Sequence, residues 1–176
     1  MEILTGIVLL IALFVGIVFV IAGRRPRDFT AARSLLIAAP RERIHALIDD
    51  LRQMNTWNPY ALRDVGSQIR YSGPERGPGA TFEFDGTKSG SGSLRILESE
   101  ASRIAMRLRM TKPIAADNRV EFTLSPGDNA TLVTWAMSGS QSLPARIMSI
   151  FIDCDRMVAR DFDEGLHNLK AIAEKS

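Results

Sequence analysis

The residue types that most often carry acid–base or metal chemistry are few in this sequence. His45 and His167 are its two histidines and Cys154 is its single cysteine, and none of them stands at a metal-ligand spacing such as HExxH or CxxC. The histidines fall among polar positions, whereas Cys154 falls on an apolar helical stripe, where a thiol is usually buried and inert. We therefore expect neither a metal site nor a bound cofactor.

Acidic side chains are more numerous, but they follow the pattern of solvent-exposed faces. Neighbouring positions on a helix do not face each other, so these groups are not expected to form a catalytic pair. They are Asp49, Asp50, Glu98, Glu100, Asp153, Asp155, Asp161 and Asp163. Strand alternation likewise turns Glu83, Asp85, Arg107, Arg109 and Glu121 outward. Acid–base catalysis is not favoured, no catalytic residue is assigned, and Tyr60 and Asp161 stay open as single inward polar groups.

Charge and the glycine-rich middle region argue against binding of nucleic acid or nucleotide. The 22 basic and 20 acidic residues are interspersed, without the basic face that a nucleic acid requires. The stretch GTKSGSGS lacks the spacing of a P-loop, and strands rather than a helix are expected after its glycines. These glycines are more typical of tight hairpins and strongly bent strands.

The remaining candidates are aromatic and sulfur-containing side chains that the periodicity of their strands and helices directs toward the interior. Singly, such residues usually pack a core, but together they could line an apolar cavity, and methionine adapts to ligands of irregular shape. The expected ligand-binding residues are Trp57 and Tyr60 near an entrance, with Phe82, Phe84, Met106, Met110, Phe122, Trp135, Phe151 and Phe162 in the interior.

An α+β arrangement must position these side chains. Ile44, Leu47, Ile48 and Leu51 recur at helical spacing after Pro40, and a strand is expected before them. A period of two over residues 66–139 predicts about six more strands in an antiparallel sheet with one buried face. From Ser142 onward a helical stripe continues for about 30 residues, which predicts one helix of about 45 Å across the sheet.

The first residues form a separate apolar segment. Residues 3–22 carry no charge and are long enough to cross about 30 Å of hydrocarbon as a helix. Arg24, Arg25, Arg27 and Arg33 follow this span and no basic residue precedes it, so the positive-inside rule predicts a single pass of the inner (cytoplasmic) membrane with the following domain in the cytoplasm. A cleaved signal peptide and a buried core helix are the alternatives. The expected organisation is a transmembrane anchor at 1–23, a basic linker at 24–32 and one folded domain at 33–176.

The order of these elements, with the stretches YSGPERGPGATFEFDG, SGSG, VTWAMSG and DFDEGLHNLKAIAE, resembles a known superfamily. It is similar to the START-like, Bet v 1-like helix-grip domains (SRPBCC), in particular to bacterial polyketide cyclase/dehydrase and lipid-transport-like proteins with an N-terminal membrane anchor. The resemblance covers residues 33–174 and implies a curved antiparallel sheet of about seven strands wrapped around a long C-terminal helix. In this family an internal cavity often takes an apolar ligand. One departure is that QMNTWNPY keeps a single tryptophan, Trp57, where related proteins often carry several.

The function implied by the resemblance is membrane-tethered binding or transport of a small hydrophobic, lipid-like ligand in the cavity, with the bilayer contacted through residues 3–22. Two alternatives stay open. One is a polyketide cyclase/dehydratase-like enzyme that uses the same cavity, and the other is a membrane-anchored interaction module with a filled core. The sequence favours no particular oligomeric state.

Overall fold

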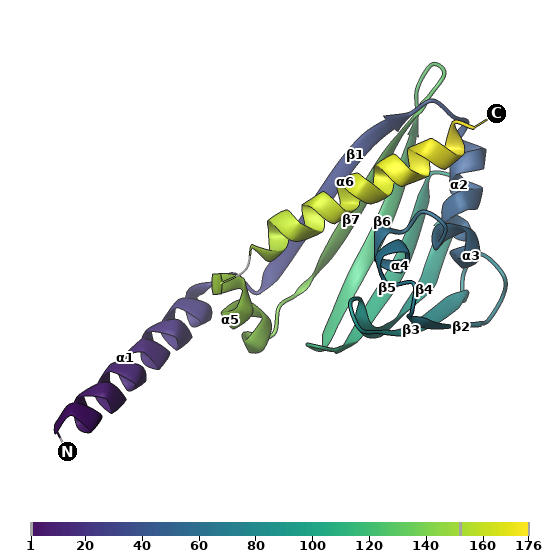
Figure 1. Cartoon of the computed structure of the whole chain (residues 1–176). Helices are drawn as coiled ribbons and strands as arrows, with labels where there is room; N and C mark the ends of the chain where they lie inside the picture. Colours follow the sequence, from purple (N-terminus) through teal and green to yellow (C-terminus); the bar gives the residue numbers. More distant parts are fainter. Residues whose placement is uncertain (1, 152, 176) are drawn as a thin grey trace.

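The computed structural model describes residues 2–151 and 153–175 and has an α+β fold (Figure 1). Its elements are α1 (Glu2–Arg24), β1 (Asp28–Ile37), α2 (Arg41–Asp49), α3 (Leu51–Met54), α4 (Pro59–Arg63), β2 (Gln68–Ser72), β3 (Thr81–Gly86), β4 (Gly90–Glu100), β5 (Arg103–Lys112), β6 (Ala116–Pro126), β7 (Thr131–Ser140), α5 (Leu143–Phe151) and α6 (Cys154–Ala173). The expected helix-grip class, with a curved antiparallel sheet around a long C-terminal helix, is confirmed.

The seven strands form one antiparallel sheet in the order β1-β7-β6-β5-β4-β3-β2. Alternate residues of the central strands face inward, so that Val133 and Trp135 of β7 lie beside Leu124 and Phe122 of β6 and are buried with them. The pairing of β4 with β5 shifts register between Ser91 and Gly92 and again between Ile96 and Glu98. Such bulges increase the twist and bend of a strand, which helps the sheet to curve.

Strand β1 begins earlier than the sequence suggested. Asp28 pairs with Ser140 and each following residue of β1 also pairs with β7, so residues 28–32 join the sheet although they were expected in a linker. The backbone N–H and C=O groups of these residues form hydrogen bonds with β7. Pairing of this kind does not depend on apolar side chains, so a polar sequence pattern does not reveal it. Three residues, 25–27, therefore separate α1 from the sheet.

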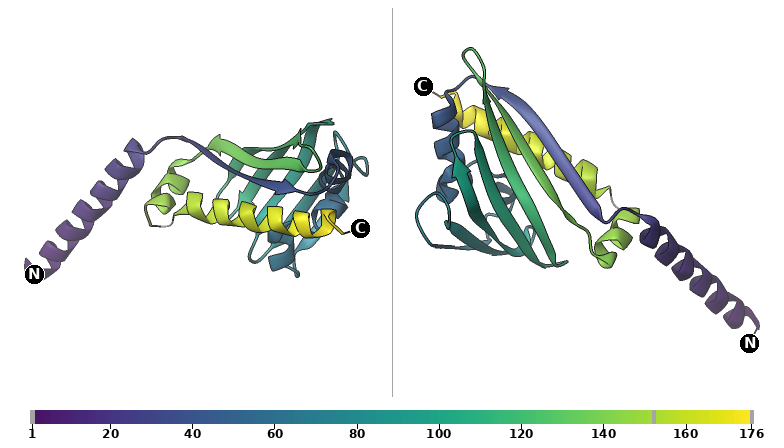
Figure 2. Two further views of the ribbon diagram at one scale, coloured as in Figure 1. Left: turned by 90° about the horizontal axis from the view of Figure 1, so that it is seen from above. Right: turned by 180° about the vertical axis from the view of Figure 1, so that it is seen from behind.

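The helices α2, α3, α4 and α6 cover the inner face of the sheet, while no helix of the described residues lies on its outer face (Figure 2). Helix α6 crosses the inner face diagonally and packs against β1, β7, α2 and α4. Its fully or nearly fully buried side chains, Phe162, Leu166 and Leu169, meet the apolar residues of the strands. This single layer of helices on a single sheet encloses the core.

The C-terminal segment differs from the single helix of about 30 residues that its stripe predicted. The chain forms α5, breaks, and restarts at α6, where the side chain of Asp153 accepts a hydrogen bond of 3.0 Å from the backbone N–H of Arg156. A side chain that caps a helix N-terminus satisfies one of its unpaired donors, so Asp153 favours a new helix start. Ile147 and Phe151 belong to α5 and lie outside the core, contrary to the expected stripe.

Helix α1 projects away from the folded domain (Figure 1). Its stretch Ile3–Arg24 is long and apolar enough to cross a membrane, and the apolar window within it is 0% buried. A buried core helix is thereby excluded as its role. The remaining interpretations are a retained anchor and a cleaved signal peptide.

Candidate ligand-binding cavity

An apolar cavity of about 220 Å³ lies between the sheet and α6. Its wall combines inward side chains of β3 to β7, one residue of α6, one residue of the β3–β4 turn and the segment from α3 to β2. The lining residues are Met54, Asn55, Asn58, Tyr60, Ala61, Ser67, Ile69, Phe82, Phe84, Ser89, Leu94, Leu108, Met110, Asn118, Val120, Trp135, Met137 and Phe162. Several hollows are larger by volume, and two of them, of about 510 and 640 Å³, lie at the surface beside the start of β1 and are lined mainly by polar and charged residues.

Strand order places this cavity at the end of the sheet from which α1 leaves. Strand β1 begins there and β7 ends there, since Asp28 pairs with Ser140. Antiparallel pairing brings Asn118 opposite Gly139 and Met110 opposite Ala116, so the start of β6 and the end of β5 lie at the same end. The lining residues Met137, Asn118 and Met110 all belong to this half of the sheet.

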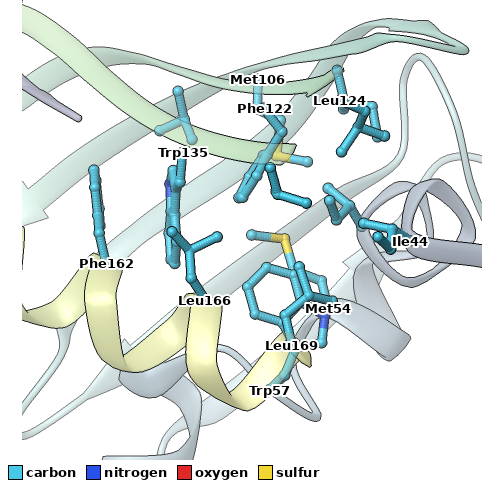
Figure 3. Close-up of a cluster of buried hydrophobic side chains, with 14 of the residues drawn as sticks. Ile44, Met54, Trp57, Met106, Phe122, Leu124, Trp135, Phe162, Leu166 and Leu169 are labelled. Carbon is cyan, nitrogen blue, oxygen red and sulfur yellow. The ribbon is translucent and has the colours of Figure 1, made fainter. Parts of the chain in front are cut away.

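The opposite half of the interior is filled. Helix α2 covers it, and Ile44 of α2 is as fully buried as Ile104 and Leu124 of the sheet, each at 0% exposure. Figure 3 shows Ile44 and Leu124 close together at one end of the cluster, with Trp135 and Phe162 at the other. The domain is therefore solid at its α2 end and hollow at its α1 end.

Several residues predicted to bind a ligand lie in the cavity wall. They come from different elements: Tyr60 from α4, Phe82 and Phe84 from β3, Met110 from β5, Trp135 from β7 and Phe162 from α6. Phe82 and Phe84 contact each other at a tilt, with ring centroids 5.8 Å apart. Alternation along the strands gave Phe82, Phe84, Met110 and Trp135 their inward phase, whereas Phe162 was placed inward by helical spacing.

The other predicted residues lie elsewhere. Trp57, Met106 and Phe122 are 0% exposed and belong to the packed core. Trp57 does not stand at an entrance, because its ring packs edge-on against Phe122 and Trp135 and its indole N–H donates to the Leu47 carbonyl at 2.9 Å. Phe151 is 65% exposed at the end of α5, since the break before α6 directs α5 away from the sheet.

An aromatic stack between β7 and α6 forms one wall of the cavity. The rings of Trp135 and Phe162 lie 4.3 Å apart between centroids and are nearly parallel, at 11°. Gly165 lets α6 approach this close, because a Cβ at that position would collide with Cζ3 of Trp135 and would stand 3.0 Å from Cδ of Pro59. The absence of a side chain at Gly165 therefore fixes the separation of helix and sheet beside the cavity.

Residues with polar side chains also line the cavity. Asn118 faces inward and is 8% exposed, and Gly139 opposite it leaves room for its amide, because a Cβ there would collide with Oδ1 of Asn118. The Nε1 of Trp135 and the hydroxyl of Ser67 are buried, and neither has a hydrogen-bond partner within residues 2–151 and 153–175. A buried donor without a partner costs stability, so a group in the cavity that accepts from Trp135 would be favourable.

An ion pair between exposed Arg63 and buried Asp161 holds α4 against α6 beside the cavity. Asp161, 4% exposed, accepts from Nη1 of Arg63 at 2.7 Å, and Arg63 also contacts Glu164 at 2.5 Å. Burial raises the pKa of Tyr60, and the charge of Asp161 and a hydrogen bond to it raise it further. Tyr60 therefore stays protonated at neutral pH and serves as a hydrogen-bond donor. Asp161 is not on a solvated face as expected, because its partner is supplied from another element.

The acidic pair at the end of α2 also differs from the expected solvated face. Asp49 is 8% exposed and accepts from the hydroxyl of Ser99 at 2.5 Å, and the same hydroxyl lies 3.2 Å from Nε2 of His45. The side chain of Asp50 instead caps α3 by accepting from the Arg52 N–H at 2.8 Å. Ser99 already donates to Asp49 and no residue of this cluster lines the cavity, so the cluster joins α2 to β4 rather than to a ligand.

The remaining chemistry-bearing residues lie outside the cavity. His167 is exposed, and Cys154, at the start of α6, is partly exposed rather than buried on the stripe, because the helix break moves it out of the core. The side chain of Asp155 is outside the described residues. Within the described parts of the chain, no group of three or more His, Cys, Asp or Glu is placed to hold a metal ion.

Two lining residues outside the predicted set carry a signal in the sequence. Asn118 has the same inward phase as Val120 and Phe122, and Met137 has the same phase as Trp135. An asparagine on the apolar side of a strand already suggests a polar contact inside. Ser67 and Ala61 had no such signal, because they lie in irregular or very short segments.

The fold and the cavity define a helix-grip domain with an internal apolar site. The chain belongs to the polyketide cyclase/dehydrase and lipid transport family, whose model matches residues 28–174. This assignment confirms the resemblance seen in the sequence. None of the curated proteins compared with this chain matches it significantly.

Solved structures support the same fold at low sequence identity. The protein CV1439 from Chromobacterium violaceum superposes with a TM-score of 0.60 at 19% identity, and covers 84% of this chain and 99% of its own. The solution structure of KanY gives 0.63 at 15% identity, with 84% and 99% covered. The Aha1 dimer from Colwellia psychrerythraea gives 0.58 at 16% identity, with 83% and 96% covered. At such identities the likeness concerns the fold alone.

Proposed function

We propose that this protein binds a small hydrophobic, lipid-like ligand in the cavity while tethered to a membrane by α1. The observation that carries the proposal is the position of the cavity: the hollow half of the domain is the half from which the apolar helix leaves. The family description, which includes lipid transport, supports the same conclusion.

The size of the cavity limits what part of a ligand it holds. A dry cavity of about 150 Å³ is enough for benzene, whereas sites for larger organic ligands usually exceed about 300 Å³. At about 220 Å³ the cavity suits one ring or a short stretch of chain. A longer isoprenoid, quinone, fatty acyl or polyketide molecule would place one end inside and the rest outside.

The polar atoms of the wall define the chemistry of that end. The Nε1 of Trp135 is a donor and the Asn118 amide offers both a donor and an acceptor, whereas the single O–H of Tyr60 is already used in its hydrogen bond to Asp161. A carbonyl, hydroxyl or ether oxygen on the ligand would satisfy them. These hydrogen bonds matter because a lipid already dissolved in a bilayer gains little from a second apolar environment.

The tether would supply the remaining part of the affinity. Helix α1 has the length and hydropathy of a membrane span, and Arg24, Arg25 and Arg27 at its end favour a cytoplasmic position for the domain at the inner membrane. Linking a binding site to the surface that holds its ligand raises the effective concentration of that ligand.

The alternative of a cyclase or dehydratase uses the same cavity and is favoured by one observation, the presence of Tyr60 as a protonated donor in its wall. Such an enzyme would convert a polyketide-like substrate, whereas a carrier releases its ligand unchanged. A filled-core interaction module would not require the cavity at all.

Native mass spectrometry of the full chain in a mild detergent tests the proposal. Ala61→Trp places a large ring in the cavity wall, and Ala46→Trp places the same ring on the exposed side of α2 as the matched control. We expect a small-molecule adduct on the wild type and on the control, and little or none on Ala61→Trp. Equal adducts on all three chains, or none on the wild type, would contradict cavity binding.

The tether is tested separately. We expect the chain to stay in the membrane fraction after a high-salt wash and to keep residues 1–23 in its intact mass. Release by salt would contradict the anchor, and a mass that lacks these residues would identify a cleaved signal peptide.

A further inference from the structure

Helix α5 has an inverted pattern of burial. Its sequence, LPARIMSIF, is apolar except for Arg146 and Ser149, yet its one buried side chain is Arg146. Opposite Arg146, at spacings of three and four, Pro144, Ile147, Met148 and Phe151 form a stripe on one face, and none of them is buried. We call these four residues the α5 stripe. A helix packed on a protein core in water would bury this face and expose the arginine.

The buried arginine joins α5 to the end of α1. Its Nη1 donates to the carbonyl of Ala22 at 3.2 Å and of Gly23 at 3.4 Å, in the last turn of α1. Arg25 donates in return to the backbone carbonyl and hydroxyl of Ser149, at 2.8 and 3.0 Å. A cation at a helix C-terminus pairs with carbonyls that have no partner in the helix, so these contacts are favourable. Helix α5 is thus held at the level where α1 ends.

We infer that the α5 stripe lies in the membrane interface, with the bilayer as its partner. The inference rests on the membrane anchoring in the proposed function. Three observations select lipid as the occupant. Helix α5 packs against α1, whose apolar window is 0% buried. The contacts of Arg146 place α5 at the end of that span. Arg24, Arg25 and Arg27 lie at the same end of the span, where anionic headgroups attract basic side chains.

This contact would also orient the cavity. Residues 25–27 join α1 to β1, and residues 141–142 join β7 to α5, so both connections are short and both come from paired strands at the hollow end of the sheet. The backbone N–H of Gln141 further donates to the carbonyl of Arg27 at 2.6 Å. Two short connections restrict rotation far more than one, and the cavity end of the domain stays next to the lipid.

Spin-label accessibility in full-length protein tests this inference. A nitroxide is attached to Phe151→Cys, with Met148→Cys as a second position on the stripe, in a Cys154→Ser background. Leu132→Cys is the matched control, because Leu132 is also an exposed apolar residue (41%) but lies at the solid end of the sheet. Phe14→Cys in α1 is the reference for the bilayer interior. The protein is reconstituted in bilayers of phosphatidylcholine and phosphatidylglycerol at three to one.

Oxygen concentrates in lipid, whereas a neutral nickel chelate stays in water, so the ratio of their collision rates with the label reports its surroundings. We expect ratios at positions 151 and 148 several-fold above position 132 and near that at position 14. A ratio at both stripe positions equal to that at 132 would overturn the inference. Spin–spin broadening there, relieved by dilution with unlabelled chain, would overturn it in favour of a second copy as the partner.

The reference position separates the two proposals. A lipid-like ratio at position 14 with water-like ratios on the stripe would reject the interfacial role of α5 and leave the anchor in place. A water-like ratio at position 14 would reject the anchor and the α5 inference together. Binding in the cavity would then still be tested independently by the small-molecule adduct in native mass spectrometry.

Discussion

Trp135 of β7 and Phe162 of α6 stack face to face at the boundary between the filled and hollow parts of the domain, with ring centroids 4.3 Å apart. One ring comes from the sheet and the other from the helix that the sheet wraps around, so the stack fixes how far the two separate. The unpartnered indole N–H belongs to the same tryptophan. The stack therefore combines a structural contact with the polar edge of the candidate site.

Gly165→Ala tests the close approach of α6 to this stack. The added Cβ would collide with Trp135, and overpacking costs about 1–3 kcal/mol, from which the better helix propensity of alanine recovers about 1 kcal/mol. We expect a net loss of up to about 2 kcal/mol of unfolding free energy, measured by chemical denaturation followed by tryptophan fluorescence. Gly66→Ala is the control, since no atom lies within 4 Å of its added Cβ. An equal effect of both changes would contradict the packing argument.

Asn118→Leu tests the polar end of the cavity. The change keeps a similar volume and removes the amide, and a hydrogen bond contributes about 0.5–1.5 kcal/mol, which corresponds to roughly 2–10-fold in affinity. We expect the fraction of chain that carries the native adduct to fall accordingly, while Asn129→Leu in the exposed β6–β7 turn leaves it unchanged. Unchanged loading of Asn118→Leu would show that the ligand makes no polar contact there.

Asp64 predicts an acid-sensitive step in stability. It accepts from the backbone N–H and hydroxyl of Ser89, at 2.9 and 2.7 Å, and from the N–H of Lys88 at 3.0 Å. The hydrogen bonds from Ser89 are the main cause of the lowered pKa of Asp64. In the unfolded chain an aspartate titrates near pH 4, so between this pH and the lower folded value the unfolded state binds the additional proton. The stabilisation is complete above about pH 4 and is lost as the pH falls.

Denaturation at a series of pH values measures this effect. We expect the unfolding free energy of Asp64→Asn to depend less steeply on pH below about pH 4 than that of the wild type. Asp128→Asn, in the exposed turn before β7, should keep the wild-type slope. A wild-type slope in Asp64→Asn would mean that other carboxylates carry the acid sensitivity.

Arg146→Gln tests the junction of α1 and α5. The change removes the charged donor to the carbonyls of Ala22 and Gly23, so α5 loses one of its two sets of side-chain hydrogen bonds to the end of α1, while those of Arg25 with Ser149 remain. We expect backbone amides of residues 143–151 to exchange hydrogen several-fold faster, with β7 unchanged. Arg156→Gln serves as the control, because the side chain of Arg156 is 88% exposed. Equal exchange in α5 of Arg146→Gln and the wild type would show that other contacts hold the helix.

Periodicity predicted the strands and their inward faces correctly, because alternation along a strand is a local property. Helical periodicity failed to predict the break before Asp153. The apolar stripe of the sequence runs on without interruption, although the side chain of Asp153 caps the start of a new helix. Helical periodicity also placed Asp161 on a solvated face, because Arg63 is 98 positions away in the chain. The failure at Asp161 involves a partner distant in the chain, which a local pattern does not specify.

The sequence by itself determined the family, the apolar N-terminal span and the set of side chains that face inward, since length, hydropathy and period are written in the order of residues. Only the tertiary structure decided which inward residues fill the core and which line a cavity. Phe122 and Phe82 have the same type and the same alternation, yet Phe122 packs against Trp57 and Phe82 borders the hollow. The difference depends on how α2, α6 and the curved sheet together fill space along the strands, and packing of that kind is set by elements distant in the chain.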